Sequence, residues 1–212
     1  MNTPLAVAAA TALLAGSAHA TVVRITAEGT VATSNIGAFT VGQDMTMVFE
    51  YESVSPRQRV ISRQAFYIDA LKSISFESGA WDTSDTGDFG QINKYDNLSN
   101  TDGIQFQVAA VASTYQHTNP KPDTVDLADI GGSVFSNVFI NFASFSENVW
   151  HDYSLPESYN FNSFDQTQNA LFAFSDGVFS VGWNEVRADV IPAPATGALF
   201  GVASVIGLRR RR

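Results

Sequence analysis

Cysteine is absent from the 212-residue sequence. This absence excludes thiolate nucleophiles, thiolate zinc sites and disulfide bridges, so buried apolar surface and backbone pairing have to stabilise the fold. Basic residues are also scarce, with 12 Lys and Arg against 21 Asp and Glu, and four of the twelve are the last residues of the chain. A nucleic-acid binder is therefore excluded, because neutralising phosphates requires clustered Lys and Arg.

The first part of the chain predicts a secretory signal peptide. An apolar run over residues 5–15 is followed by Ala18 and Ala20, small residues at alternate positions that are typical of a signal peptidase site. Cleavage is expected between Ala20 and Thr21. A buried N-terminal helix is the alternative, but the strand-like segment that follows disfavours a helix of that length.

The C-terminus has three parts. It contains Pro192, Ala193 and Pro194, then the uncharged residues 195–208, then Arg209, Arg210, Arg211 and Arg212. As a helix, the uncharged part would be about 21 Å long, which is shorter than the roughly 30 Å hydrocarbon core of a bilayer. The segment therefore predicts a short transmembrane helix that anchors the chain temporarily, with the arginines on the cytoplasmic side. An ordinary tail anchor and a core helix are the alternatives.

This C-terminus resembles the PEP-CTERM sorting signal of Gram-negative bacteria, with Ala193 in a Pro-Ala-Pro variant of its motif. The resemblance implies that an exosortase-type enzyme processes the chain near the two prolines. It also implies export through the inner membrane and an extracellular or cell-surface location, in species that make exopolysaccharide. The chain then divides into a signal peptide (1–20), an ectodomain (21–190) and a sorting signal (191–212).

Period-two alternation across the ectodomain indicates β-strands with one buried face. In the clearest strand, residues 44–52, one face carries Met45, Met47, Phe49 and Tyr51. Further strands are predicted at residues 22–26, 74–76, 104–110, 134–142, 171–174, 178–183 and 185–190. Asp176 and Gly177 predict a tight hairpin turn, and a few helical turns are expected near residues 56–65.

Many short strands between turn residues favour an all-β fold, an antiparallel β-sandwich of jelly-roll-like type. The composition, with 16 Phe, suits strands better than long helices. Residues 37–51 and 155–164 also resemble the ectodomains that often precede this sorting signal, which implies the fold and no particular activity.

Aromatic residues gather late in the ectodomain among Asn, Ser, Asp and Glu: Trp150, His151, Tyr153, Tyr159, Phe161 and Phe164. This mixture offers apolar faces to sugar rings and polar groups to hydroxyls, and is therefore a candidate glycan-binding site. The alternative is that these side chains plug the end of the sandwich, because most aromatic residues belong to a core.

Carboxylates recur at every third position in two places, Asp82, Asp85 and Asp88, and Asp123, Asp126 and Asp129. Hard oxygen ligands near turns are what Ca²⁺ prefers, so the first triple is a candidate calcium site. Neither triple fits the loop pattern of an EF-hand, and solvated turn carboxylates are the alternative. No other metal or cofactor is predicted.

Recognisable catalytic motifs are missing. Beyond the signal peptide only His117 and His151 remain, without G-x-S-x-G, H-E-x-x-H or a phosphate loop. The expected function is that of an exported cell-surface or exopolysaccharide-matrix protein with a structural or glycan-binding role and no enzymatic activity. Its expected partners are signal peptidase, the exosortase, the inner membrane in passing, and exopolysaccharide. The alternative is a secreted glycan-active hydrolase, because a glycosidase needs only a carboxylate pair.

Overall fold

The computed structural model describes residues 21–79, 81–98, 101–115, 121–145, 149, 152–158, 160–164 and 167–191, and for residues 57–59, 97 and 167 the backbone only. The signal peptide up to Ala20 and the sorting signal from Pro192 to Arg212 lie outside the described residues and stay predictions. No helix in the described part of the chain is both long and apolar enough to cross a membrane.

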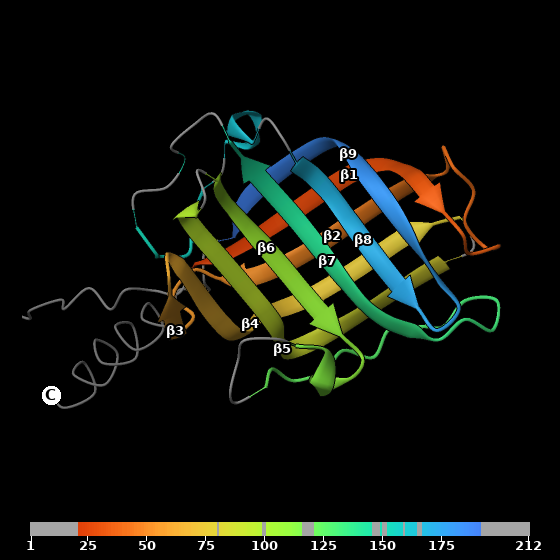
Figure 1. The fold of residues 1–212 in the computed structure, drawn as a ribbon, viewed down its shortest axis with the longest axis horizontal. Coiled ribbons are helices and arrows are strands. Elements are labelled where there is room, and N and C mark those ends of the chain that lie inside the picture. The colour runs from red at the N-terminus through yellow and green to blue at the C-terminus, as the bar shows by residue number, and fades with distance from the viewer. Residues whose placement is uncertain are drawn as a thin grey trace, which may run out of the picture.

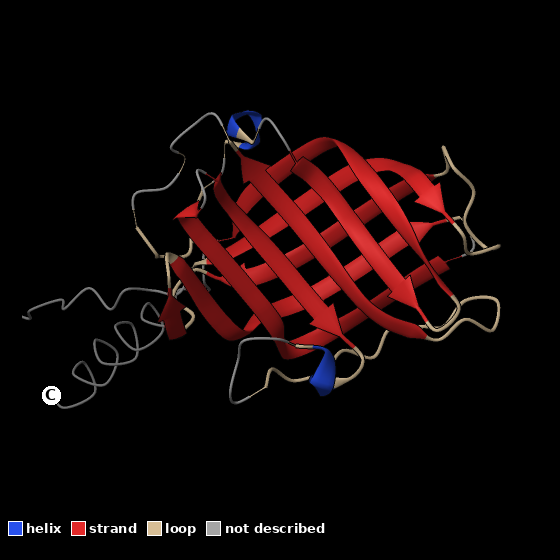
Figure 2. Ribbon diagram, in the orientation of Figure 1, coloured by secondary structure: helices blue, strands red, loops and turns tan. Residues whose placement is uncertain are grey.

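Nine strands account for most of the described residues, and the only helical elements among them are two short 3-10 turns (Figure 2). The strands are β1 (Val22–Ser34), β2 (Asp44–Glu52), β3 (Arg57–Ile61), β4 (Gln64–Ser78), β5 (Trp81–Leu98), β6 (Thr101–Ala109), β7 (Phe135–Ser144), β8 (Thr167–Phe174) and β9 (Gly177–Ile191). The 3-10 turns are η1 (Ala112–Thr114) and η2 (Phe161–Ser163).

The sheet closes on itself. Hydrogen bonding runs through the strands in the order β2-β1-β9-β8-β7-β6-β5-β4-β3, and β2 also pairs with β4, where Met47 lies opposite Phe76. Eight strands therefore form a closed antiparallel barrel, while β3 pairs with β4 alone (Figure 1). The predicted all-β antiparallel fold is confirmed, but the predicted jelly-roll-like β-sandwich is wrong, because one continuous sheet encloses the core.

The length of the strands allows the sheet to close. β4 and β5 are 15 and 18 residues long. β4 can therefore pair with β3 through residues 64–67 and with β2 through residues 71–77. Between the two pairings lies Asp69, a non-glycine residue with φ of 53°. An alternating sequence pattern cannot distinguish this arrangement from a sandwich, since inward and outward positions alternate in both.

The helical turns expected near residues 56–65 are also wrong. This stretch forms β3 and a tight turn into β4 at Ser62 and Arg63, whose φ values are 42° and 68°. Two successive residues in the left-handed region match a type I′ turn, the hairpin turn whose twist suits antiparallel strands.

Several strand predictions are confirmed. β2 has the predicted bounds, and its four predicted inward side chains are buried. β8 and β9 form the predicted hairpin, with Phe174 paired to Gly177. The two strands predicted at residues 178–183 and 185–190 are the single strand β9, whose alternation changes phase because a bulge lies opposite Glu28 and Gly29 of β1.

Aromatic side chains fill the barrel interior. Phe172 stacks on Phe179 with ring centroids 4.4 Å apart, and meets Phe76 edge to face at 5.0 Å. Trp81 packs against the same rings, and its indole nitrogen donates to the Ala128 carbonyl at 2.8 Å. The interior of this barrel is therefore a packed core, as in other small barrels. A ligand has to bind at an end of the barrel or on its outer wall.

Truncating Phe172 to alanine should lower the free energy of unfolding by about 3–5 kcal/mol, because the fully buried ring leaves a cavity among Phe76, Trp81 and Phe179. Urea unfolding followed by tryptophan fluorescence measures the change. Leu171→Ala is the matched control, since the adjacent side chain points outward with 43% of its surface exposed and should shift stability by less than about 0.5 kcal/mol. Equal losses in the two variants would contradict the packed interior.

Candidate functional site

One end of the barrel is closed by residues of the predicted aromatic cluster. Phe161 and Phe164 are buried, with ring centroids 5.1 and 6.2 Å from that of Phe142 inside the barrel. Tyr153 is partly buried against the same core. For these three residues the structure matches the plug that was the alternative to a glycan site. The remaining members, Trp150, His151 and Tyr159, lie outside the described residues.

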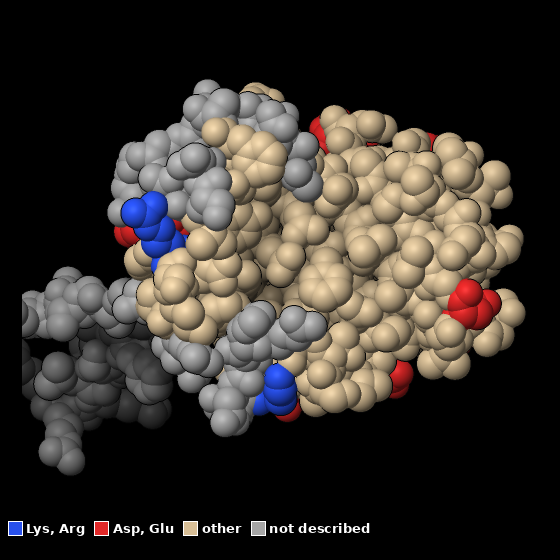
Figure 3. All heavy atoms as spheres, in the orientation of Figure 1, with Lys and Arg blue, Asp and Glu red and all other residues tan. Residues whose placement is uncertain are grey.

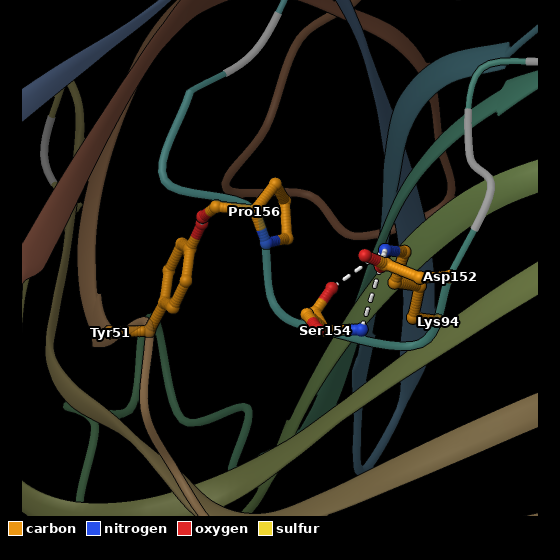
Figure 4. A network of polar contacts seen from close by, with 5 residues as sticks. All are labelled: Tyr51, Lys94, Asp152, Ser154 and Pro156. Atoms are coloured by element: carbon orange, nitrogen blue, oxygen red, sulfur yellow. Dashed lines mark hydrogen bonds and ion pairs between the residues drawn. The ribbon is translucent and has the colours of Figure 1, made fainter. Parts of the chain in front are cut away.

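A buried lysine fastens the loop over this end (Figure 4). Lys94 points inward from β5, and its ammonium donates to the Ser154 carbonyl at 2.6 Å and lies 3.2 Å from the Asp152 carboxylate. Tyr51 donates to the Pro156 carbonyl. Burial lowers the pKa of Lys94, while Asp152 opposes that shift. The network fixes residues 152–156 across the barrel end.

A hollow of about 590 Å³ lies beside this loop, at the segment that connects β2 to β3. Tyr67 and Tyr153 line it together with Ser53 and Glu157. The two polar side chains already engage each other, since Ser53 donates to the Glu157 carboxylate at 3.3 Å. This hollow therefore offers aromatic surface, while part of its hydrogen-bonding capacity is already used.

A second hollow, of about 260 Å³, opens on the outer wall of the barrel. We call it the amide hollow, since five of its seven lining residues carry amide side chains and the other two are phenylalanines: Gln64, Phe66, Gln91, Asn93, Gln105, Gln107 and Phe139. These residues come from β4, β5, β6 and β7, strands that lie side by side in the sheet (Figure 1).

Two glutamines in this hollow are left with unused hydrogen-bonding groups. Gln91 and Gln107 lie opposite each other in the register and expose only 3% and 2% of their surface. The Gln91 Nε2 donates to the Gln107 Oε1 at 3.0 Å. Gln91 Oε1 and Gln107 Nε2 then have no partner among the described residues. If both side-chain amides are flipped, so that oxygen and nitrogen exchange places, Gln107 donates to Gln91 instead. One donor and one acceptor again have no partner.

Unpaired polar atoms are concentrated in this one place. The described residues contain four buried side-chain nitrogen or oxygen atoms without a hydrogen-bond partner. Three of them belong to Gln91, Gln107 and Asn93, which all line the amide hollow, and the fourth is the Trp183 indole nitrogen. Leaving a buried polar group unpaired costs about 1–3 kcal/mol, so these atoms favour a hydrogen-bond partner from outside the chain, either water or a ligand.

An amide row extends from the hollow across the wall. It consists of side chains at register-matched positions on four consecutive strands, Asn93, Gln105, Asn141 and Asn169. Gln105 donates to Asn141 at 2.7 Å, and Asn141 donates to Asn169 at 3.5 Å. The row continues the hydrogen-bonding surface of the hollow toward β8.

The wall around these amides carries no charged residue at its described outward positions on β6, β7 and β8. The space-filling view of this face shows Lys, Arg, Asp and Glu only near the margins (Figure 3). Phe139 is half-buried there, and its register neighbour Leu171 on β8 is 43% exposed. The face therefore combines amides with apolar side chains.

Sequence reasoning missed the amide hollow and the amide row. Their signal is present in the chain, because outward positions flanking inward apolar residues are amides, as with Gln105 and Gln107 on either side of Phe106. Recognising the site required knowing that β5, β6 and β7 are neighbours in this register. The dense aromatic cluster near residue 150 was the more visible pattern.

The calcium candidates do not converge. Asp82, Asp85 and Asp88 lie along β5. The Asp85 carboxylate accepts from the backbone amides of Thr86 and Asp126, both at 2.7 Å, and the Asp88 carboxylate lies 2.6 Å from the Lys72 ammonium. Within the described ranges, no group of three His, Asp or Glu residues could hold a metal ion.

The second aspartate triple helps to hold a connecting segment against the barrel. The backbone amide of Asp123 donates to the Asp69 carboxylate at 2.7 Å, and Asp129 accepts from the Phe135 amide at 3.0 Å. Asp126 contributes the backbone amide that is bound by Asp85. In this region the carboxylates act as hydrogen-bond acceptors for backbone groups.

Comparisons with known proteins give no relative: no family model, curated protein or solved structure matches this chain. The amide hollow and the amide row are therefore interpreted from their own residues.

Replacing Asp69 with asparagine should stabilise the fold at pH 7. Burial raises the pKa of Asp69 above its ordinary value of 3.8, supported by the nearby carboxylates of Asp123 and Asp88. A raised pKa means that ionised Asp69 disfavours the folded state, and that this cost disappears as pH falls through the folded pKa. The asparagine side chain is neutral, can still accept the hydrogen bond from the Asp123 amide, and tolerates the positive φ at this position.

Urea unfolding of Asp69→Asn at pH 7 and at pH 3 tests this. The gain in stability should be clear at pH 7 and shrink at pH 3, where the wild-type carboxyl is largely protonated. Glu28→Gln is the control, because Glu28 is exposed and pairs with Arg187, away from Asp69, so its neutralisation should not stabilise the protein. A destabilised Asp69→Asn variant with no dependence on pH would show that the carboxylate charge is not unfavourable there.

Proposed function

We propose that this chain is an exported cell-surface or exopolysaccharide-matrix protein that binds polysaccharide through the amide hollow on its outer wall. The observation that carries the proposal is the unpaired donor and acceptor of Gln91 and Gln107 in a hollow that also presents Phe66 and Phe139. Sugars match this combination, since their hydroxyls both donate and accept hydrogen bonds while their ring faces pack on aromatic side chains.

A bound ligand would supply hydrogen-bond partners for the unpaired atoms of Gln91 and Gln107. An unused donor or acceptor in a buried position destabilises the free protein, and a bound hydroxyl that supplies the missing partner recovers part of that cost. Both glutamines line the hollow, so a group seated in it is within reach of their side-chain amides after a rotation about the terminal side-chain bonds.

Delivery follows from the two predicted sorting segments. The signal peptide sends the chain through the inner membrane, and the PEP-CTERM-like end holds it there until an exosortase-type enzyme processes it. The ectodomain then meets polysaccharide outside the cell. In this account the protein contributes adhesion or cohesion of the matrix by passive binding.

Among their described lining residues, neither the amide hollow nor the hollow at the barrel end has the carboxyl pair of a glycosidase. A glycosidase places two carboxyl groups on either side of the scissile bond. No carboxylate lines the described part of the amide hollow, and only Glu157 lines the hollow at the barrel end. The glycan-active hydrolase considered from the sequence therefore lacks a described pair of carboxylates at either place.

Retention of the full-length protein on the extracellular polysaccharide of its source organism tests the function. Phe139→Ala should weaken retention about fivefold or more, since losing about 1 kcal/mol of apolar contact changes affinity by that factor. Tyr153→Ala is the matched control at the barrel end and should be retained like the wild type. The opposite result, with Tyr153→Ala released and Phe139→Ala retained, would move the site to the barrel end.

Mass spectrometry of the protein recovered from culture fluid and membranes tests the delivery route. The proposal predicts a mature chain that starts at Thr21 and ends near Pro192. Recovery of chains that still end at Arg212 from both fractions would contradict processing at the sorting signal.

A further inference from the structure

We infer that the ligand of the amide hollow is a neutral, hydroxyl-rich polysaccharide that is bound as an extended chain across the strands; this inference rests on the function proposed above. Three features carry it, which are the absence of charge at the described outward positions of β6, β7 and β8, the presence of one free donor beside one free acceptor, and the length of the amide row.

The charge distribution disfavours an anionic ligand. The described residues that line the hollow include no Lys or Arg, and the whole chain has a formal net charge of −9. Sulfate or carboxylate groups entering the hollow would lose their hydration without gaining a cation, and the field of the protein would repel them. A neutral polymer does not meet this penalty.

The unpaired groups also select against anions. Gln107 Nε2 needs an acceptor, whereas Gln91 Oε1 needs a donor. A hydroxyl group can do both, and two neighbouring hydroxyls on one sugar can serve the two atoms separately. An ionised carboxylate or sulfate only accepts hydrogen bonds, so it would leave the Gln91 oxygen without a partner.

The amide row sets the size of the ligand. Asn93, Gln105, Asn141 and Asn169 lie on four neighbouring strands, which together span about 14 Å at the usual strand spacing. A single sugar ring is shorter than this row. A polymer that enters the hollow and follows the row can contact both sets of amides, and Leu171 beside the row adds apolar surface.

The decisive experiment uses the source organism's own extracellular polysaccharide, separated by anion exchange into a neutral and an acidic fraction. Each fraction is immobilised, and retention of the full-length protein is measured at about 50 and about 500 mM NaCl. The inference predicts retention on the neutral fraction that changes less than about twofold between the two salt concentrations, since ion pairing would be screened by added salt.

The other outcomes distinguish a failure of this inference from a failure of the proposed function. Retention on the acidic fraction alone, or retention that is lost at high salt, would overturn the inference while leaving polysaccharide binding intact. Retention on neither fraction would overturn the proposed function itself. Monosaccharides released from the neutral fraction by complete hydrolysis should compete at least tenfold more weakly than the intact polymer, and equal competition would overturn binding as an extended chain.

The double variant Gln91→Leu and Gln107→Leu assigns the binding to the hollow. Replacing both bonded amides by apolar side chains of similar size removes the unpaired atoms of Gln91 and Gln107, so the folded state should be as stable as the wild type or more stable. Retention on the neutral fraction should nevertheless fall at least tenfold. A stable double variant that binds normally would overturn the inference.

Two measurements complete the design. Arg24→Leu with Glu50→Leu is the matched control, since it removes a cross-strand polar pair from β1 and β2, outside the amide hollow and the amide row, without changing the net charge. This variant should bind like the wild type.

The molar mass in solution tests for self-association. A dimer in the wild type that becomes a monomer in the glutamine double variant would assign the hollow to a second copy of the chain and overturn the inference.

Discussion

The closure of the sheet around aromatic side chains is the constraint on which the other features depend. Once β2 pairs with β4, the inward positions of eight strands face one another, and rings such as Phe76, Phe172 and Phe179 fill the space between them. A filled barrel of this size has no room for a ligand along its axis. In the proposed function, the ligand therefore binds on a surface outside the packed interior, namely the outer wall.

The two surfaces considered as sites differ in how their polar groups are used. At the barrel end, Lys94 and Tyr51 already bind the carbonyls of the covering loop, so polar side chains there serve closure. On the wall, Gln91 and Gln107 form one hydrogen bond with each other, and the second polar atom of each side-chain amide has no partner among the described residues. Buried polar groups contribute most to stability when they are fully paired, so the incomplete pairing is the reason for proposing the wall, and not the barrel end, as the binding surface.

Sequence alone predicted the elements whose pattern is local. β2 alternates between buried and more exposed side chains over its full length, and the hairpin between β8 and β9 forms as predicted, although its turn residues are Ser175 and Asp176, one position earlier than expected. β5 was missed completely, because its first half contains Asp85 and Gly87, which are typical of a turn. The closure of the barrel could not be predicted, since it depends on the register between β2 and β4 and not on alternation.

The candidate site on the wall was not predicted from the sequence. The aromatic cluster suggested glycan binding, but Phe161 and Phe164 belong to the core, and the amides that replaced them as candidates are spread over four strands. Residues such as Gln91 and Gln107 are 16 positions apart, and only the pairing of β5 with β6 brings their side chains together. Long-range register therefore decides the site as it decides the fold.

The most direct measurement of the central claim is a side-chain amide NMR titration of the ¹⁵N-labelled protein with oligosaccharides from the neutral polysaccharide fraction. The account predicts saturable shifts of the Gln91 and Gln107 side-chain NH₂ signals, with the backbone N–H signals of residues 152–155 and of Glu157 unchanged. Shifts confined to residues 152–157, with both glutamine signals unmoved at saturation, would contradict it.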